Sequence, residues 1–584
     1  MSVEQLITAH LDIWTAAVSE KKSGRGRSSG STGSVYGIKK LRELILELAV
    51  RGKLVPQDES DEPASELLKR IQIEKTNLLA EGKKKKDKPI ASIFEDELSF
   101  LIPKGWEWTS VANLTLLITD GTHHTPKYQE NGVPFISVKD IDGFTVSFDD
   151  CKYISQKEHE VINGRCNPER DDILLCRIGT LGRPTIVDTD KAFSLFVSVG
   201  LLKLPKSVKF SRYFQLALSS PLMYLQYAKI MAGGSHTNKL NLGDIPRLSV
   251  PIPPLAEQHR IVAKVDELMA LCDQLENQHN NAAEAHDKLV THLLGTLTQS
   301  QNAEEFKTNW QRISEHFDTL FTTEVSIDVL KQTLLQLAVM GKLVPQDPND
   351  EPASELLKRI LKERDRQIDQ EGSKTIASDK INESEMYITT PDSWVYCRLG
   401  NIARFIDYRG KTPSKISSGV PLITAKNVRF GYISREPEEH VSPAEYESWM
   451  TRGFPRVGDM LFTTEAPLGN IAIINIAEKF ALAQRVICFK LHDQAIGAYL
   501  KIAIMSDQVQ QQLINAATGM TATGIKASKL KEIPVPIPTL AEQHRIVAKV
   551  DELMVICDQL KAGITSGNQL QQKIADVLVE QTTA

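Results

Sequence analysis

The segment LAEQHRIVAKVDELM occupies residues 255–269 and returns letter for letter at residues 540–554. Chance does not repeat fifteen residues, so the chain contains an internal duplication at a distance of 285 residues. A duplication of this kind restricts the fold to two copies of one unit. The first task is therefore to find which parts of the copies are kept and which differ.

Two further pieces show that the whole chain is duplicated. GKLVPQD at 52–58 recurs at 341–347, and DEPASELLKRI at 61–71 recurs at 350–360. The blocks between these pieces repeat only weakly. Their shared skeleton pairs Asp120, Thr125, Pro126, Lys139, Asp172 and Gly182 with Asp407, Thr412, Pro413, Lys426, Asp459 and Gly469. We infer two domains with one fold and different surfaces, held in a nearly identical frame.

The near-identical pieces have helical periodicity. Five apolar residues of the first copy step by four, three, four and three, which is a narrow seam of the coiled-coil kind. They are Ile261, Val265, Leu268, Cys272 and Leu275, and they recur as Ile546, Val550, Leu553, Cys557 and Leu560. Each helix is expected to run about 40 residues, roughly 60 Å. The seam favours a partner helix; packing of each helix on its own domain is the alternative.

Shorter helices are predicted at 38–50 and 327–340, with Gly52 and Gly341 as C-terminal caps. Pro63 and Pro352 then open a further helix at its first turn.

The blocks between the helices contain short β-rich runs broken by Gly, Pro and Asp, followed by helical stretches at 211–231 and 498–517. They are therefore mixed α/β domains, and their strand order cannot be read from the sequence. The segments 19–34 and 83–88 have the composition of solvated linkers.

Composition excludes several classes of protein. The apolar runs are far short of the ~18 residues that a membrane span needs, and the N-terminus lacks the pattern of a signal peptide. Seven cysteines without a Cys-x-x-Cys pair argue against disulfides and zinc ribbons, and a reducing cytoplasm is the expected setting. Cys272 and Cys557, on the apolar face of the repeated segment, are expected to be buried. The net charge of −5 divides unevenly: residues 101–250 carry +2, residues 391–538 carry +4, and the remainder carries −11. Two mildly basic blocks in an acidic frame are compatible with DNA contact.

Catalytic signatures are absent from the sequence. No G-x-x-x-x-G-K-[ST] phosphate loop, no G-x-G-x-x-G after a strand and no Asn-Pro-Pro-aromatic or Asp-Pro-Pro-aromatic tetrapeptide occurs. Neighbours on an extended segment point to opposite faces, so joint metal ligation by His123 and His124 is not expected.

Donor-rich loops at matching places in the two blocks are the candidate binding residues. Such side chains can bond base edges, while hydroxyls and backbone N–H groups can hold phosphates; ordinary solvated turns are the alternative. The candidates are Thr122, His123, His124, Lys127, Lys139, Arg177, Arg183, Ser235, His236, Asn238 and Lys239 in the first block, and Tyr408, Arg409, Lys411, Lys415, Lys426, Asn427, Thr464, Arg485, Thr523 and Lys526 in the second.

The order of these motifs resembles the specificity subunit of type I restriction–modification enzymes, of the longer kind with an N-terminal extension. PIPPLAEQHRIV at 251–262 and PIPTLAEQHRIV at 536–547 look like the ends of the family's variable domains. GVPLITAKNV at 419–428 and GDMLFTTEAPLGN at 458–470 are similar to its target-recognition motifs, and RDDILLCRIGTLG in the first block is a looser match.

The resemblance implies an α+β fold with two mixed α/β target-recognition domains, separated by long antiparallel coiled-coil helices in an internal pseudo-twofold repeat. It implies a non-catalytic subunit whose domains each read one half of a gapped double-stranded DNA site. The helices would set the spacer and dock two methyltransferase subunits, with two restriction/motor subunits in the full complex. S-adenosylmethionine, ATP and magnesium would then belong to the partners, and this chain would bind no cofactor.

On this basis the chain divides into seven segments. We expect an N-terminal helix and linker (1–36), the first copy of the helical region (37–96), target-recognition domain one (97–254), a central long helix (255–326), the second helical region (327–390), target-recognition domain two (391–539) and a C-terminal long helix (540–584). Two rival functions remain: an enzyme that carries its own recognition domains, and a helical scaffold whose variable domains bind proteins.

Overall fold

The computed structural model describes residues 3–17, 35–81, 100–179, 181–232, 239–370, 381–408, 413–518 and 524–583. The chain forms two compact units: Met1–Ala282 with Gly567–Ala584, and Ala283–Ser566. The two basic segments that were predicted to be linkers, 19–34 and 83–88, lie outside the described residues. Each unit is a mixed α/β domain on a helical frame.

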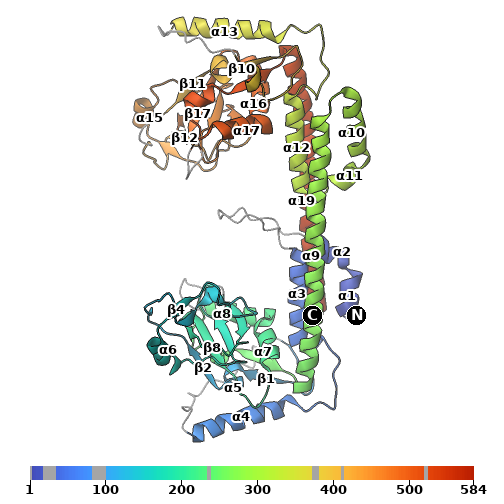
Figure 1. Ribbon diagram of the computed structural model, residues 1–584, viewed down its shortest axis with the longest axis vertical. Coiled ribbons are helices and arrows are strands. Elements are labelled where there is room, and N and C mark those ends of the chain that lie inside the picture. The colour runs from blue at the N-terminus through green and yellow to red at the C-terminus, as the bar shows by residue number, and fades with distance from the viewer. Residues whose placement is uncertain are drawn as a thin grey trace. The chain divides into compact units, whose positions relative to one another are not determined.

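Unit one has a frame in which helix α3 lies along helix α9 (Figure 1). Arg42 of α3 forms ion pairs of 2.7 Å with both Asp273 and Glu276 of α9. The frame consists of α1 (Val3–Ala9), α2 (Leu11–Ala16), α3 (Tyr36–Val50), α4 (Ala64–Ala80), the first part of α9 (Leu255–Gln299) and the end of α19 (Leu540–Thr583).

The domain of unit one contains a four-stranded sheet in the order β2-β8-β5-β6, a three-stranded sheet β4-β3-β7 and the pair β1-β9. Its elements are β1 (Glu107–Ser110), α5 (Val111–Leu114), β2 (Leu117–Asp120), β3 (Val133–Ile136), β4 (Lys152–Ile154), α6 (Gln156–Asn163), β5 (Ile173–Cys176), β6 (Gly182–Ile186), β7 (Ser194–Leu195), β8 (Val199–Lys203), α7 (Ser211–Leu218), α8 (Pro221–Ala232) and β9 (Ser249–Ile252).

The domain of unit two repeats this topology strand for strand, as β11-β17-β14-β15, β13-β12-β16 and β10-β18. Its elements are β10 (Val395–Arg398), α14 (Leu399–Ile402), β11 (Ala403–Asp407), β12 (Val420–Ile423), β13 (His440–Val441), α15 (Pro443–Trp449), β14 (Met460–Thr463), β15 (Ile471–Ile473), β16 (Ala481–Leu482), β17 (Val486–Leu491), α16 (Gly497–Met505), α17 (Asp507–Ala516), α18 (Ala527–Lys531) and β18 (Pro534–Ile537).

The frame of unit two contains α12 and the first part of α19, joined by ion pairs of Lys561 with Asp328 and of Lys331 with Asp558. Its other helices are α10, α11 and α13. The bounds are α10 (Ala303–Glu315), α11 (Phe317–Leu320), α12 (Glu324–Val339) and α13 (Ala353–Gln370).

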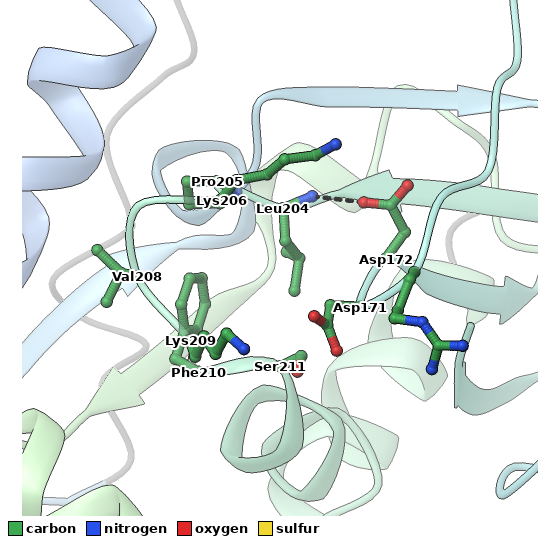
Figure 2. A pocket seen from close by; sticks show the side chains of 10 residues that line it. Asp171, Asp172, Leu204, Pro205, Lys206, Val208, Lys209, Phe210 and Ser211 are labelled. Carbon is green, nitrogen blue, oxygen red and sulfur yellow. Dashed lines mark hydrogen bonds between the residues drawn. The ribbon is translucent and has the colours of Figure 1, made fainter. Parts of the chain in front are cut away.

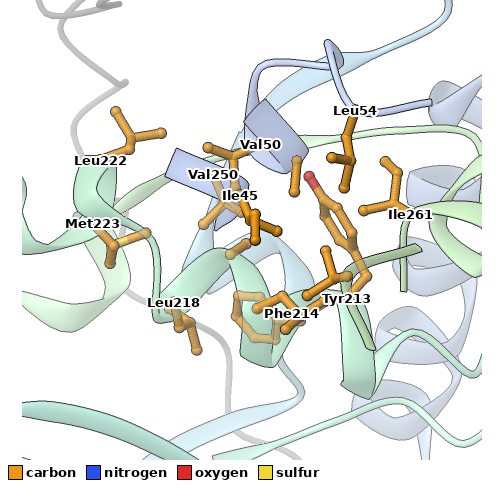
Figure 3. Close-up of a cluster of buried hydrophobic side chains, with 14 of the residues drawn as sticks. Ile45, Val50, Leu54, Tyr213, Phe214, Leu218, Leu222, Met223, Val250 and Ile261 are labelled. Carbon is orange, nitrogen blue, oxygen red and sulfur yellow. The ribbon is translucent and has the colours of Figure 1, made fainter. Parts of the chain in front are cut away.

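The hydrophobic core of unit one joins the frame to the domain. Ile45 and Val50 of α3, Tyr213 and Phe214 of α7 and Ile261 of α9 belong to one buried cluster (Figure 3). The seam of α9 therefore packs on its own domain as well as on helices, and both readings of the heptad pattern hold. The apolar face of the first turns of α9 contributes to the packing of both the frame helices and the domain, so these turns are buried against the domain.

The two long helices meet in both units. In unit one, Ala575 of α19 belongs to the buried cluster that contains Cys272 of α9. In unit two, Cys557 of α19 belongs to the cluster that contains Val290 of α9. The helices are 45 and 44 residues long, close to the expected 40.

Several local predictions can be compared with the structure. Gly52 and Gly341 follow the caps of α3 and α12, both with φ of +67°. Pro63 and Pro352 stand one position earlier than predicted, immediately before the helix rather than in its first turn. The segment 300–326, expected to continue the central long helix, contains α10 and α11 instead. Among the described residues, no helix combines the length and apolarity that crossing a membrane requires.

Candidate nucleic-acid interface

A buried polar clamp fixes each domain to its long helix. Trp106, just before β1, donates its indole N–H to Glu257 at the start of α9 over 2.9 Å, and Gln57 donates to the same carboxylate over 2.7 Å. Burial raises the pKa of the Glu257 carboxyl, and the two donors oppose this rise. In unit two, Trp394 and Gln346 bond Glu542 over the same 2.9 and 2.7 Å.

A second clamp also occurs twice. Arg260 binds Asp61 with a shortest N–O distance of 2.6 Å, and Arg545 binds Asp350 with one of 2.7 Å. The side-chain pairing raises the pKa of each arginine further above its ordinary value. The duplicated letters of the sequence are thus the residues that orient each domain on its frame.

The donor-rich loops of unit one gather at one end of the four-stranded sheet. Strand β2 ends at Asp120 and leads into the loop 121–128, while Arg177 follows strand β5. The Arg177 N–H donates to the carbonyl of Ser198, just before β8, and Ile178 forms an antiparallel bridge with Lys239. Loops that are up to 120 residues apart in the sequence therefore meet at this edge, which we call the reading edge.

Asp120 organises the reading edge of unit one. Its carboxylate is 1% exposed and receives hydrogen bonds from Arg177 and Arg165. A ring nitrogen of His123 lies 3.2 Å away. Arg177 also donates to the carbonyls of Val197 and Leu240, over 3.1 and 3.2 Å. One buried acid thus joins three basic side chains, two of which reach the surface.

The reading edge of unit two has the same backbone and different side chains. The Thr464 N–H donates to Arg485, and the Ile525 N–H donates to Thr464, as their counterparts do around Arg177. Asp407 pairs with Arg452 at 3.3 Å, matching the Asp120–Arg165 pair. Thr464 stands where unit one has Arg177, so this position carries a buried guanidinium in unit one and a hydroxyl in unit two.

Three of the predicted contact residues are buried. Arg177 is 4%, Tyr408 2% and Asn427 1% exposed. The Tyr408 hydroxyl donates to the carbonyl of Gly453, and Asn427 donates to the carbonyls of Ser434 and Pro437. Side chains with these partners position neighbouring backbone; they do not present donors to a ligand.

The remaining predicted residues are exposed, partly exposed or undescribed. Thr122 and Thr464 are partly exposed, and Thr122 bonds within its own loop. Lys415 pairs with Glu439 over 2.8 Å and Arg485 with Glu465 over 2.5 Å, each about half exposed. His123, His124, Lys127, Lys139, Arg183, Lys239, Lys426 and Lys526 are exposed. Ser235, His236, Asn238, Arg409, Lys411 and Thr523 lie outside the described residues.

Lys139 and Lys426 occupy equivalent tight turns. In unit one, the Asp140 carboxylate accepts from the backbone N–H and the hydroxyl of Ser137. In unit two, the Asn427 amide oxygen accepts from the corresponding groups of Thr424. Each turn exposes the lysine that precedes its capping residue, and in unit one this lysine pairs with Asp150 over 3.1 Å.

A cavity of about 220 Å³ lies at the opposite end of strand β5 from the reading edge (Figure 2). Asp171, Asp172, Lys206 and Lys209 are among its lining residues, and Asp172 accepts from the Leu204 N–H over 3.0 Å. Burial raises the pKa of the Asp172 carboxyl. The mixed charges and the location separate this cavity from the predicted contact residues.

The search for metal ligands and reactive thiols covers the described part of the chain. Among those residues, no group of three His, Cys, Asp or Glu side chains could hold a metal ion. All seven cysteines are free and buried, which confirms the predicted burial of Cys272 and Cys557. Burial raises the pKa of the Cys272 thiol to about 11, which leaves it protonated at neutral pH.

The sequence analysis did not select Arg165, Arg452, Glu257 or Glu542 as functional. The signal was available, because Arg165 and Arg452 stand at the same 287-residue spacing as Asp120 and Asp407. An acid and a base that recur together at one spacing indicate a pair, even where the letters between them differ.

A tandem pair of α/β domains, each clamped to a helical frame by repeated contacts and each with its own set of polar loops, is a bivalent recognition protein. The family model for the type I restriction modification DNA specificity domain matches residues 103–285 and 391–567. The chain belongs to this family, and its domains are DNA-recognition domains rather than catalytic ones.

Known relatives extend over the full length. The chain is 39% identical to the type I restriction enzyme EcoAI specificity subunit and 38% identical to the EcoEI specificity subunit, both from Escherichia coli. Each match covers 99% of both chains. A chain from a solved structure of the type I R-M system is 17% identical with a TM-score of 0.48, over 83% of this chain and 99% of that one.

Proposed function

We propose that this chain is the subunit that selects the DNA sequence for a type I restriction–modification complex, each domain reading one half of a gapped site. The observation that carries the proposal is the division between frame and reading edge. The clamps at Glu257 and Glu542 have the same partners at the same distances. The edge around Arg177 has Thr464 as its counterpart in the other unit. Two like sockets with two unlike readers fit an asymmetric DNA site bound by two like partners.

The exposed basic groups of the reading edges supply the DNA contacts in this proposal. His123, His124, Lys127, Arg183 and Lys239 serve the first half-site. Arg and Lys contacts to phosphate give affinity that falls with salt, and base-edge bonds contribute about 1–3 kcal/mol of discrimination each. Lys426, Arg485 and Lys526 serve the second half-site, while Arg177, Tyr408 and Asn427 position the loops.

The helices have two roles in this proposal. The paired helices α9 and α19 set the spacing of the two half-sites, and the repeated frame docks two methyltransferase subunits. Two restriction/motor subunits complete the assembly. S-adenosylmethionine, ATP and magnesium act in those partners, and the complex works in the bacterial cytoplasm, where its DNA is found.

Exchange of residues 101–250 for another recognition domain tests the independent readers. Mapping methylated adenines in a host genome should show a change in one half of the site only. A change in both halves would contradict the proposal. Insertion of one helical turn, about four residues, after Met269 should alter the length of the gap, and an unchanged gap would refute the spacing role of the helices.

Two rival functions are separated by binding assays. S-adenosylmethionine binding to the purified chain would favour an enzyme with its own recognition domains. Absence of sequence-specific, salt-sensitive DNA binding by the complex with its methyltransferase partner would favour a scaffold that binds proteins.

A further inference from the structure

Each domain carries a short hairpin whose tip exposes aromatic rings. The first hairpin is closed by an antiparallel bridge between Ile141 and Val146, the second by one between Val428 and Ile433. The bridges lie 287 residues apart, so the hairpins are equivalent. We name residues 142–145 the first tip and residues 429–432 the second tip.

The aromatic side chains at the tips are unusually exposed. Phe144 is 74% exposed at the first tip, and Tyr432 is 62% and Phe430 37% exposed at the second. Exposed aromatic rings cost solvation free energy, and a ring can contribute a large apolar contact to a binding partner.

The first tip is held rigidly. The backbone N–H groups of Phe144 and Thr145 donate to the Asp142 carboxylate over 2.7 and 2.9 Å. Gly143 donates to the hydroxyl of Thr185 over 3.0 Å, and its carbonyl accepts from Gln215 over 2.8 Å. A fixed backbone presents the ring of Phe144 without further ordering cost, which favours binding.

The second tip is held by different bonds in the same place. Arg429 donates its backbone N–H to Tyr432 and Gly431 donates to Ile471, both over 2.9 Å. Asn470 donates its side-chain amide to the carbonyl of Val428, also over 2.9 Å. Both hairpins therefore contact the strand that follows the reading-edge turn, β6 in the first domain and β15 in the second.

Each tip also has an exposed arginine beside it. In unit one, the Cβ that an alanine at Gly143 would carry lies 3.7 Å from the Cα of Arg183. In unit two, exposed Arg429 belongs to the tip itself. A ring that packs on a base edge in the groove, such as the thymine methyl group, beside a guanidinium that binds phosphate is the chemistry of a duplex DNA contact.

We propose that the aromatic ring of each tip packs against a base of the half-site read by its own domain, Phe144 in the first domain and Tyr432 in the second. This inference rests on the proposed function. DNA is favoured over a protein partner because the frame that would meet two like partners is repeated almost unchanged, whereas the tips differ in sequence. The first tip reads Asp-Gly-Phe-Thr and the second Arg-Phe-Gly-Tyr.

The test uses the complex of this chain with its methyltransferase partner and duplexes that carry the site found by methylation mapping. Phe144→Ala should weaken specific binding about tenfold, which corresponds to a loss of about 1.4 kcal/mol. Base preference should relax at one position of the first half-site and stay unchanged in the second. Tyr432→Ala should relax base preference at one position of the second half-site and leave the first unchanged. Phe144→Trp should retain binding.

Leu117→Ala is the matched control, because Leu117 is 42% exposed at the other end of strand β2. It should leave binding unchanged. A fluorescent adenine analogue placed along each half-site should report quenching that disappears with the corresponding alanine variant. A ring that packs on a base changes this signal, whereas a merely structural residue leaves it unaltered.

The outcomes separate the two proposals. If wild-type complex binds its site and both alanine variants match it in affinity, base preference and quenching, the tip inference is overturned and the proposed function stands. If the wild-type complex shows no specific binding, the proposed function fails. A third outcome is that the alanine variants lose the methyltransferase subunit on co-purification but bind DNA with the affinity of the wild-type chain. In that case the tips bind protein, and the inference is again overturned.

Discussion

Replacement of Asp120 by alanine should destabilise the first domain far more than replacement of its counterpart Asp407 destabilises the second. Asp120 is buried and faces Arg177, whose side chain is 5% exposed. Loss of the carboxylate leaves a buried guanidinium without its counter-charge, which costs about 3–5 kcal/mol. Two carbonyl acceptors of Arg177 remain, so we expect the lower end, about 3 kcal/mol.

The Asp407–Arg452 pair has an exposed base instead. Its partner Arg452 has a side chain that is 51% exposed, and exposed ion pairs contribute about 1 kcal/mol or less. Asp407→Ala is thus the matched control, with the same chemistry at the equivalent position and a predicted loss of under about 1 kcal/mol.

Hydrogen exchange followed by mass spectrometry measures both losses in one chain, because it reports the opening free energy of each segment separately. Strands β5 and β8 should lose protection in Asp120→Ala, and strands β14 and β17 should be almost unaffected in Asp407→Ala. The first variant should also weaken reading of one half-site alone. Equal loss of protection in the two variants would refute the argument from the buried arginine.

Three further predictions concern the frame and the second domain. Trp106→Phe and Trp394→Phe should each cost about 1.5–3 kcal/mol, the range for a lost hydrogen bond to a charged group; clearly unequal losses in denaturant unfolding would contradict equivalent clamps. Gly52→Ala and Gly341→Ala should each lower stability by at least about 1–2 kcal/mol, since φ is +67° at both and a new Cβ would meet a proline ring; unchanged thermal melting would count against this. Burial raises the pKa of the Asp459 carboxyl, so the ionised form opposes folding at neutral pH and this cost disappears as pH falls through the folded pKa. Asp459→Asn should therefore stabilise the protein at pH 7 and lose that advantage in acid, and a gain that is independent of pH would refute the assignment.

The repeated frame could be predicted in detail because identical letters at one spacing must make identical contacts. The apolar seam from Ile261 to Leu275 predicted helix α9, and Gly52 predicted where helix α3 ends. The DNA-contact residues were harder to predict, because the identity of a polar residue in a loop does not show whether its side chain faces solvent or bonds the backbone. Arg177, Tyr408 and Asn427 point inward since unpaired backbone carbonyls beside them require donors.

The strand order and the helices α10 and α11 escaped prediction for a different reason. Short strands such as β7 and β16 have two residues each and depend on pairing with distant partners. Their propensity is set by tertiary contact and not by local sequence. The two tips were missed because Phe144 and Tyr432 are one position apart in the repeat, so letter-by-letter alignment hides their equivalence.

The placement of Arg177 and Glu257 explains how one fold can keep its attachment while its reading surface changes. Glu257 bonds Trp106 and Gln57, whereas Arg177 bonds Asp120 and the carbonyls of Val197 and Leu240. Within the described part of the chain, these two sets of hydrogen bonds share no partner. Effects of substitutions at sites without shared partners add to within a few tenths of a kcal/mol. A change such as arginine at 177 to threonine at 464 therefore alters the loops without loosening the clamp. Divergence of the second domain under an unchanged frame needs no compensating change elsewhere, which is the condition for two readers to acquire different targets within one chain.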